Sequence, residues 1–190
     1  MYELDKKELQ YWINRYSETE QRGEKEIEEN LTKKFQTQGF ANKEEIIELL
    51  HWKFGTMQGR LKRELNLIGK EPDLCIIEKT KQAFKSREDL DLEKIKVLKS
   101  IKGFGNAVTS VVLTFYNPNK YGVFDIHAWR ELFGKETESK DYNTTKALLR
   151  FFEELREISK ETGLTCREVE KALFTKNYLG SKGSESGKGY

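Results

Sequence analysis

The sequence has very few of the residues that build metal centres or cross-linked scaffolds. Its 190 residues include two cysteines, Cys75 and Cys166, and two histidines. An iron–sulfur cluster needs four thiolates, and a structural zinc site needs four cysteine or histidine ligands. We therefore expect no iron–sulfur cluster and no organising metal ion, and we expect both thiols to be reduced.

Proline is equally scarce, and long apolar runs are missing. Only Pro72 and Pro118 interrupt the chain. No stretch approaches the roughly eighteen apolar residues of a membrane span, and residues 1–20 lack the apolar core of a secretion signal. We expect a soluble, intracellular protein of the cytoplasm, nucleoid or nucleus that has no membrane partner.

A large charge of one sign is also missing. The 34 basic and 32 acidic side chains leave a net charge of +2, which excludes a polybasic tail or an acidic disordered protein. The distribution is nevertheless uneven. Residues 1–50 carry an excess of four acidic groups, residues 51–90 and 91–130 each carry an excess of three basic groups, and residues 131–190 are balanced. A basic middle of the chain is compatible with a nucleic-acid partner.

Apolar residues recur at helical spacing almost throughout the chain, which predicts an all-α protein. We expect a single domain over residues 1–180, in which the helices of residues 1–40 add an acidic cap. Residues 181–190 are rich in glycine and serine and are expected to form a disordered tail. The expected helices cover residues 4–19, 24–37, 43–54, 57–68, 72–84, 91–101, 106–116, 126–133, 143–161 and 166–178.

Residues 101–105 (Ile-Lys-Gly-Phe-Gly) stand between two expected helices and predict a tight hairpin. Phe104 would enter the core, while the two flanking glycines would adopt backbone angles closed to other residues. The second helix would then present its first N–H groups, at Asn106 and Ala107, to an anion such as a phosphate. The alternative interpretation is an ordinary helix–helix turn.

A second segment, residues 123–130 (Val-Phe-Asp-Ile-His-Ala-Trp-Arg), places an aspartate before an expected helix. Asp125 is the only acidic residue between Lys94 and Arg130. The commonest role of such an aspartate is to cap the helix, and the helix dipole favours its ionised form. Capping and catalysis are compatible roles for this carboxylate.

Together the two segments resemble the signature of the helix-hairpin-helix (HhH-GPD) DNA glycosylase superfamily. In that family a Leu-Pro-Gly-apolar-Gly hairpin is followed downstream by a Val-Asp-x-His segment. The resemblance implies an all-α, two-lobed helical bundle with a helix-hairpin-helix motif and a cleft between the lobes. It is nearest to the 8-oxoguanine glycosylase-like branch. The matching residues are Ile101, Gly103, Phe104 and Gly105 in the hairpin, and Phe124, Asp125, His127 and Trp129 in the second segment.

The activity implied by the resemblance is cleavage of the N-glycosidic bond of a flipped nucleotide in base excision repair. Asp125 would be the catalytic residue, because an ionised carboxylate stabilises the oxocarbenium-like sugar. Bifunctional members carry a nucleophilic lysine two positions after the second glycine, and this chain has Ala107 there, so no Schiff base forms at that position. The resemblance therefore implies a monofunctional DNA N-glycosylase, with an oxidised purine such as 8-oxoguanine as the first hypothesis for its substrate.

Three alternatives remain open. A lysine elsewhere could make the protein a bifunctional glycosylase and lyase. The same hairpin could serve a DNA-binding or lesion-recognition module without catalysis. The glycines could also form only a turn in a helical interaction domain.

The resemblance also implies the partner and its contacts. The partner is double-stranded DNA with a flipped damaged base, bound by a monomer that needs no cofactor, although a monovalent cation at the hairpin is compatible with the motif. Lys102 replaces the usual proline and adds a positive charge beside the expected phosphate. The expected DNA contacts are Lys102, Gly103, Phe104, Gly105, Asn106, Ala107, His127 and Arg130. Candidates for the base pocket, each equally compatible with ordinary packing or solvation, are Trp52, Gln58, Glu170 and Phe174.

Overall fold

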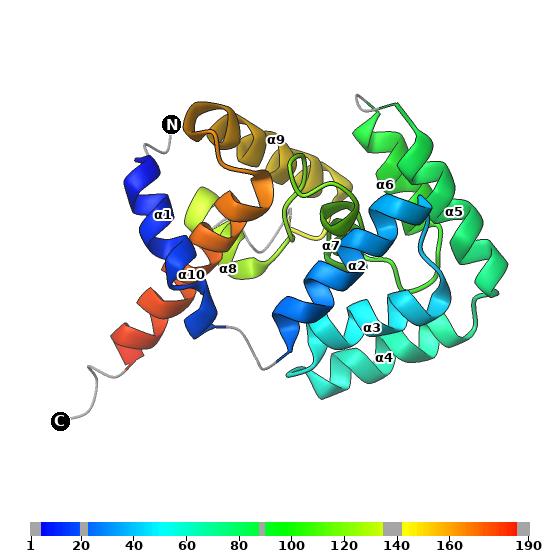
Figure 1. The fold of residues 1–190 in the computed structure, drawn as a ribbon. Helices are drawn as coiled ribbons and strands as arrows, with labels where there is room; N and C mark the ends of the chain where they lie inside the picture. The colour runs from blue at the N-terminus through cyan, green and yellow to red at the C-terminus, as the bar shows by residue number, and fades with distance from the viewer. Residues whose placement is uncertain (1–4, 20–22, 88–89, 135–141, 186–190) are drawn as a thin grey trace. The chain divides into compact units, whose positions relative to one another are not determined.

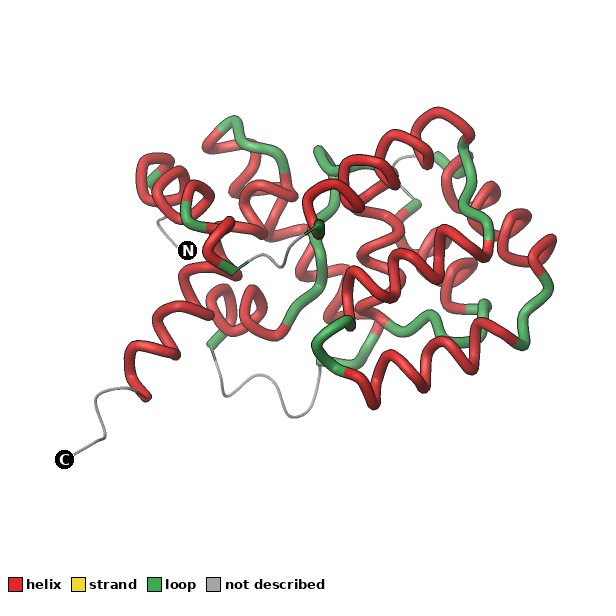
Figure 2. Tube along the Cα trace, turned by 60° about the horizontal axis from the view of Figure 1, so that its bottom comes forward, coloured by secondary structure: helices red, strands yellow, loops and turns green. Residues whose placement is uncertain are grey.

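The computed structural model describes residues 5–19, 23–87, 90–134 and 142–185. These residues form ten α-helices, one short 3₁₀ helix and connecting loops, with no strand among them (Figure 2). The all-α fold class is therefore confirmed. The chain divides into two compact units: a central unit of residues 21–117, and a terminal unit that combines residues 1–20 with residues 118–190.

Six helices form the central unit, and α7 lies among three of the others. Helix α7 contacts α2, α3 and α6 (Figure 1). Its residues 106–115 are all buried. An uncharged, apolar helix of this kind can be stable in water only when other helices cover it on every side. The helices are α2 (Glu24–Gln38), α3 (Lys43–Phe54), α4 (Gln58–Gly69), α5 (Asp73–Lys85), α6 (Asp91–Lys99) and α7 (Asn106–Tyr116).

The terminal unit is organised around its last helix, α10, which packs on α1, α8 and α9. Its core is aromatic: Phe124, Trp129, Phe151 and Phe152 are almost completely buried. The elements of this unit are α1 (Lys6–Asn14), η1 (Tyr16–Glu18), α8 (Ile126–Phe133), α9 (Thr145–Thr162) and α10 (Cys166–Glu185).

The helices near both ends of the chain differ from the expected ones. The first expected helix, 4–19, is broken after Asn14, and a 3₁₀ turn follows. The last helix was expected to end at residue 178 but continues to Glu185, so it extends into the segment expected to be a tail. Residues 186–190 lie outside the described residues.

The expected acidic cap of residues 1–40 is divided between the two units. Helix α1 packs on α10 in the terminal unit, whereas α2 packs on α3 and α7 in the central unit. The reason is that each helix follows its own buried apolar residues: Leu9 in α1, and Leu31 and Phe35 in α2. An acidic outer face shared along the sequence does not determine where a helix packs.

The described residues contain neither a membrane-spanning helix nor a cluster of metal ligands. None of the described helices has the length and apolar content required to cross a bilayer. Nowhere in the described ranges do three or more histidine, cysteine, aspartate or glutamate side chains gather as metal ligands would.

Candidate functional site

The hairpin of residues 101–105 joins α6 to α7 in the central unit. Ile101 and Phe104 are buried, and the Phe104 N–H donates to the Ile101 carbonyl at 3.1 Å. Gly103 has a φ of +86°, the left-handed region that favours glycine. A Cβ at this position would also lie 3.2 Å from the Cβ of Leu67 in α4. The backbone conformation therefore requires glycine at 103, as the sequence predicted, and an added Cβ would also press on Leu67.

Gly105 is different, and the expectation that it adopts a backbone angle closed to other residues is wrong. Its φ of −77° and ψ of −177° are open to any residue, and an added Cβ would meet nothing within 4 Å. Nothing in the described chain therefore requires glycine at this position. Gly105 itself is exposed, and it places no side chain in front of the first residues of α7.

The first turn of α7 has no side-chain cap. Asn106 and Ala107, both expected to contact DNA, are 8% exposed, so any contact from them would come from backbone N–H groups. The Asn106 Oδ1 accepts a hydrogen bond from Lys99 Nζ at 3.0 Å. Burial lowers the pKa of Lys99 from its usual value.

Lys102 lies at the surface of the hairpin beside an acid. Its Nζ is 3.4 Å from Glu71 Oε1, and the Glu71 side chain is only 8% exposed. Burial alone would raise the pKa of Glu71, but hydrogen bonds from Cys75 and Lys102, with the positive charges of Lys102 and Lys79, hold this pKa below its ordinary value. A phosphate at the hairpin would therefore compete with Glu71 for Lys102.

One carbonyl of the hairpin region already accepts a cationic donor. Lys79 Nζ donates to the Ser100 carbonyl at 3.0 Å. A monovalent cation bound there would have to displace this ammonium group.

Asp125 begins α8 in the terminal unit. Its Oδ1 accepts the His127 N–H at 3.0 Å, which is the geometry of an N-cap, and its side chain is half-buried. The capping role expected from the sequence is confirmed. The carboxylate also lies at the positive end of the helix dipole, which stabilises its ionised form.

The segment before Asp125 is held by two buried, charged residues of α10. Arg167 and Glu170 form an ion pair whose side chains are 5% and 2% exposed. Glu170 Oε2 also accepts the Val123 N–H at 3.3 Å, and the backbone N–H of Arg167 donates to the Pro118 carbonyl at 3.0 Å. Glu170 was a candidate for contacting a base edge, but the structure places it inside the protein as a support for residues 118–123.

His127 is in the first turn of α8, and its ring contacts α10. Its Nδ1 is 3.0 Å from Asn177 Oδ1, and its ring meets Phe174 and Tyr178 edge to face, with centroid distances of 5.6 and 5.2 Å. The Asn177 amide nitrogen donates to Glu131, and its amide oxygen faces His127 Nδ1. The His127 ring is therefore held against α10.

Phe174 therefore lies beside His127, and two candidate residues far apart in the sequence are brought together. Phe174 also stacks on Tyr178, with centroids 5.4 Å apart and an interplanar angle of 13°, and meets Tyr16 edge to face at 6.1 Å. Phe174 and Tyr178 belong to α10, Tyr16 belongs to η1, and His127 belongs to α8. The cluster is half-buried.

The remaining candidates are distributed over both units. In the terminal unit, Arg130 is half-buried in the last turn of α8. In the central unit, Trp52 donates from Nε1 to the Glu24 carbonyl at 3.1 Å and packs on Phe115, and exposed Gln58 donates to the Gly55 carbonyl. Two pocket candidates therefore belong to each unit.

Three residues of this region were not predicted from the sequence: Arg167, Asn177 and Tyr178. A weak signal for two of them was present, because Arg167 precedes Glu170 by three positions and Tyr178 follows Phe174 by four, which places each pair on one helix face. Nothing in the sequence indicated that Asn177 faces His127, because that contact joins residues fifty positions apart.

Neither thiol contributes to the hairpin or to the α8 N-terminus. Cys166 is fully buried at the start of α10, where burial raises the pKa of its thiol to about 11. Cys75 is half-buried, and its Sγ lies 3.5 Å from Glu71 Oε2. The two residues belong to different units.

Comparison of the chain with protein-family models, with curated proteins and with solved structures found no match. Function therefore has to be inferred from the residues and their geometry.

Proposed function

We propose that the protein is a monofunctional DNA N-glycosylase, in which Asp125 is the catalytic residue and the hairpin of residues 101–105 binds the DNA backbone. One observation carries the proposal. A hairpin that requires glycine at position 103 leads into a helix without a side-chain cap, and a half-buried aspartate follows Gly105 by twenty positions at the start of another helix.

The hairpin supports the part of the proposal that concerns binding. The start of α7 combines backbone N–H groups with the positive end of the helix dipole, and such ends bind phosphate in many proteins. Gly105 adds no side chain that would hinder a phosphodiester from approaching. Lys102 is exposed and supplies a positive charge close by.

Asp125 supports the part that concerns catalysis. When the bond between C1′ and the base nitrogen breaks, its electrons leave with the base and the sugar becomes positively charged. An ionised carboxylate beside C1′ stabilises that charge and orients the water that then bonds to C1′. The water loses its proton to solvent or to the carboxylate, the departing base takes up a proton from solvent, and the products are a free base and an abasic site. The buried Arg167–Glu170 pair limits movement of the segment before Asp125, as such a catalyst requires.

Strand cleavage is not part of the proposed reaction. Position 107 holds alanine, so the amine that would form a Schiff base there is missing. The abasic product should therefore break only after treatment with alkali. Trapping of a covalent complex by borohydride would show instead that another lysine gives the protein lyase activity.

The decisive experiment is a base-release assay on end-labelled duplexes, each with one modified base: uracil, hypoxanthine, 8-oxoguanine or an alkylated purine. We expect wild-type protein to release at least one of these bases. Asp125→Asn should slow the release on the order of a hundredfold or more while DNA binding is retained, because a transition-state charge loses its counterion. Asparagine also caps helices well, so the fold should be preserved.

The chain offers a matched control in Asp5, which caps α1 and accepts the Lys7 N–H at 3.2 Å. Asp5→Asn makes the same chemical change at another helix start of the same unit and should leave base release unchanged. Equal rates for wild type and Asp125→Asn would overturn the catalytic role of Asp125. DNA binding without release of any tested base would overturn the enzymatic proposal.

That last outcome would favour a second candidate function, a lesion-recognition module without catalysis. One observation favours it: Phe174, His127 and Tyr178 already pack on one another. These rings would have to separate before a base could stack on one of them.

A further inference from the structure

We infer that the exposed face of α4 is a second binding surface for the backbone of duplex DNA, adjoining the hairpin within the central unit. The inference rests on the proposed function in taking duplex DNA as the ligand, but it does not require catalysis. The surface is defined by the side chains of Lys62, Arg63 and Lys70, with Arg60 at its edge.

The charge of α4 distinguishes it from the other described helices. Its exposed charged residues are Arg60, Lys62 and Arg63, and Lys70 follows directly at its C-cap. Its single acid, Glu64, is buried and pairs with Arg63. Every other described helix that contains charged residues has at least one aspartate or glutamate that is not buried. A surface of one sign attracts a ligand of the opposite sign.

The basic residues of α4 also stand where a helix would favour acids. Three of them lie in its N-terminal half, and its first turn contains no acidic residue and no side-chain cap. Of these three, Arg60 lies in the first turn, where positive charge is unfavourable because it faces the positive end of the dipole. Only Arg60, which lies 4.4 Å over the Phe54 ring, and Arg63 have compensating contacts in the structure as described. An arrangement that opposes local stability is expected at a binding surface.

The surface continues into the hairpin. The Cβ that Gly103 lacks would lie 3.2 Å from Leu67 and 3.5 Å from both Ile68 and Glu64, so the hairpin packs directly on the last turns of α4. Lys102 adds its charge at this junction and pairs with Glu71, which follows α4 by two residues. The two acids of the junction, Glu64 and Glu71, are both buried.

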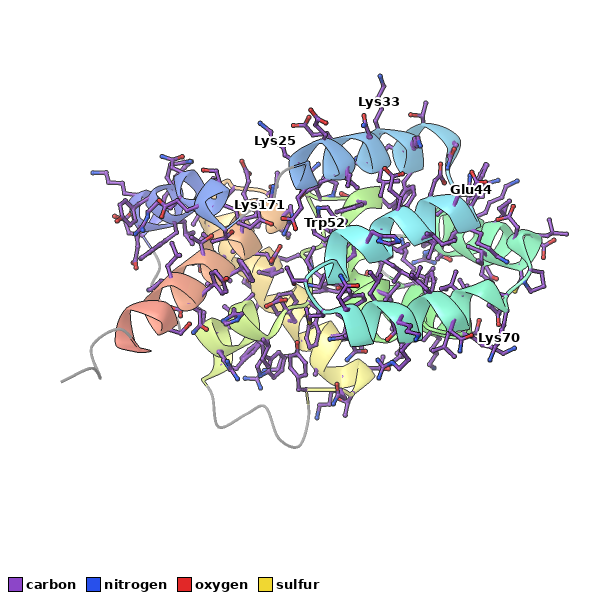
Figure 3. All side chains as sticks on the ribbon, turned by 90° about the horizontal axis from the view of Figure 1, so that it is seen from below. Lys25, Lys33, Glu44, Trp52, Lys70 and Lys171 are labelled. Atoms are coloured by element: carbon purple, nitrogen blue, oxygen red, sulfur yellow. The ribbon has the colours of Figure 1, made fainter. Side chains whose placement is uncertain are left out.

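The spacing of the exposed lysines suits a duplex. At a rise of about 1.5 Å per residue, Lys62 and Lys70 lie about 12 Å apart along the helix axis. The major groove of B-DNA is also about 12 Å wide, so the two ammonium groups can reach phosphates on opposite sides of one groove. Figure 3 shows Lys70 projecting from one end of α4, and Lys33 of α2 projecting from a different side of the central unit.

The test compares two double variants by fluorescence anisotropy with a labelled, undamaged duplex. Lys62→Gln/Lys70→Gln removes two charges from the surface, and Lys33→Gln/Lys34→Gln removes two from the exposed face of α2. The first should weaken binding about tenfold near 50 mM salt and reduce the slope of log K against log salt concentration by about 1.8, which is two phosphate contacts. The control should keep the wild-type slope. Because the Lys62 side chain is exposed, Lys62→Gln alone should leave unfolding by urea unchanged.

Three outcomes would overturn the inference: an unchanged salt slope in the α4 variant, an equal loss of affinity in the α2 control, or no binding of the duplex by wild type at low salt. Binding of phosphatidylglycerol vesicles that depends on α4 more strongly than DNA binding does would also overturn it, in favour of a membrane surface. Failure of the proposed function gives a different result, because the α4 effect would persist while no substrate releases its base. The Asp125→Asn variant should retain the full wild-type salt slope.

Discussion

The candidate binding region of the central unit and the candidate catalytic region of the terminal unit are built in different ways. Around Gly103 the chain relies on backbone geometry, and the charges there, at Lys102 and along α4, are exposed. Around Asp125 the chain relies on buried side chains, above all Arg167 and Glu170. A surface that binds a charged polymer needs accessible positive charge, whereas a catalytic carboxylate needs a fixed position. The difference between the units matches the two roles proposed for them.

The largest effect should come from breaking the buried ion pair of the terminal unit. Glu170→Ala should lower the free energy of unfolding by about 3–5 kcal/mol, because Arg167 would remain buried without the Glu170 carboxylate that balances its charge, although it would keep its hydrogen bond to the Tyr16 hydroxyl. The Val123 N–H would lose its acceptor as well. Urea unfolding measures the loss. A change below about 1 kcal/mol would show that the support of residues 118–123 does not depend on this pair.

Two glycine-to-alanine substitutions, one in each unit, compare how closely other atoms pack around Gly122 and Gly105. At Gly122 in the terminal unit an added Cβ would lie 2.5 Å from Leu155 Cδ1, 2.8 Å from Glu170 Cβ and 3.1 Å from the Cys166 carbonyl oxygen. Gly122→Ala should therefore destabilise the protein by about 1–3 kcal/mol. Gly105→Ala in the central unit meets nothing within 4 Å and should change stability by less than about 1 kcal/mol.

The same two glycine variants also separate an effect on stability from an effect on DNA binding. If a phosphodiester approaches the start of α7, Gly105→Ala should weaken duplex binding although it leaves the fold intact. Thermal unfolding and anisotropy measure the two effects on the same samples. A Gly105→Ala variant as destabilised as Gly122→Ala would contradict the description of Gly105 as unconstrained.

The smallest effect should come from the exposed pair of the central unit. Lys102→Gln should cost at most about 1 kcal/mol near neutral pH, because the Lys102 side chain is 64% exposed and solvent weakens its attraction for Glu71. The pKa of Glu71 lies below its ordinary value of 4.5, so its stabilising contribution is present above pH 4.5 and is lost as the pH falls below that value. The difference between wild type and Lys102→Gln should therefore shrink in acid. A difference that grows as the pH falls would contradict the Lys102–Glu71 pairing.

The two glycines of the hairpin show how far the sequence predicted the site. The pattern of residues 101–105 predicted a buried Phe104 and a special backbone angle at Gly103, and both are present. The same pattern assigned the same constraint to Gly105, which has none. The sequence pattern alone does not distinguish a glycine required by the fold from a glycine at an unconstrained position. The difference lies in the backbone angles and in the atoms that surround the residue.

Trp129 and Glu170 illustrate the same limit for side chains. Trp129 belongs to the segment that matches the family signature, and it is 1% exposed and packs against Phe124 and Phe133. Glu170 was a candidate for the base pocket because of its place on the last helix, but it is buried with Arg167. A helical pattern indicates which face turns inward, and it does not indicate that an ion pair will occupy that face.

The sequence by itself determined the helices between residues 24 and 162 with their approximate ends, the cap at Asp125 and the special glycine at 103. These features depend on interactions within a few residues along the chain, which spacing and residue type reveal. Only the tertiary structure decided that residues 1–40 divide between two units, that His127 meets Asn177 and Phe174, and that Lys102 pairs with Glu71. Those contacts join residues dozens of positions apart, and they follow from which apolar faces pack together in space.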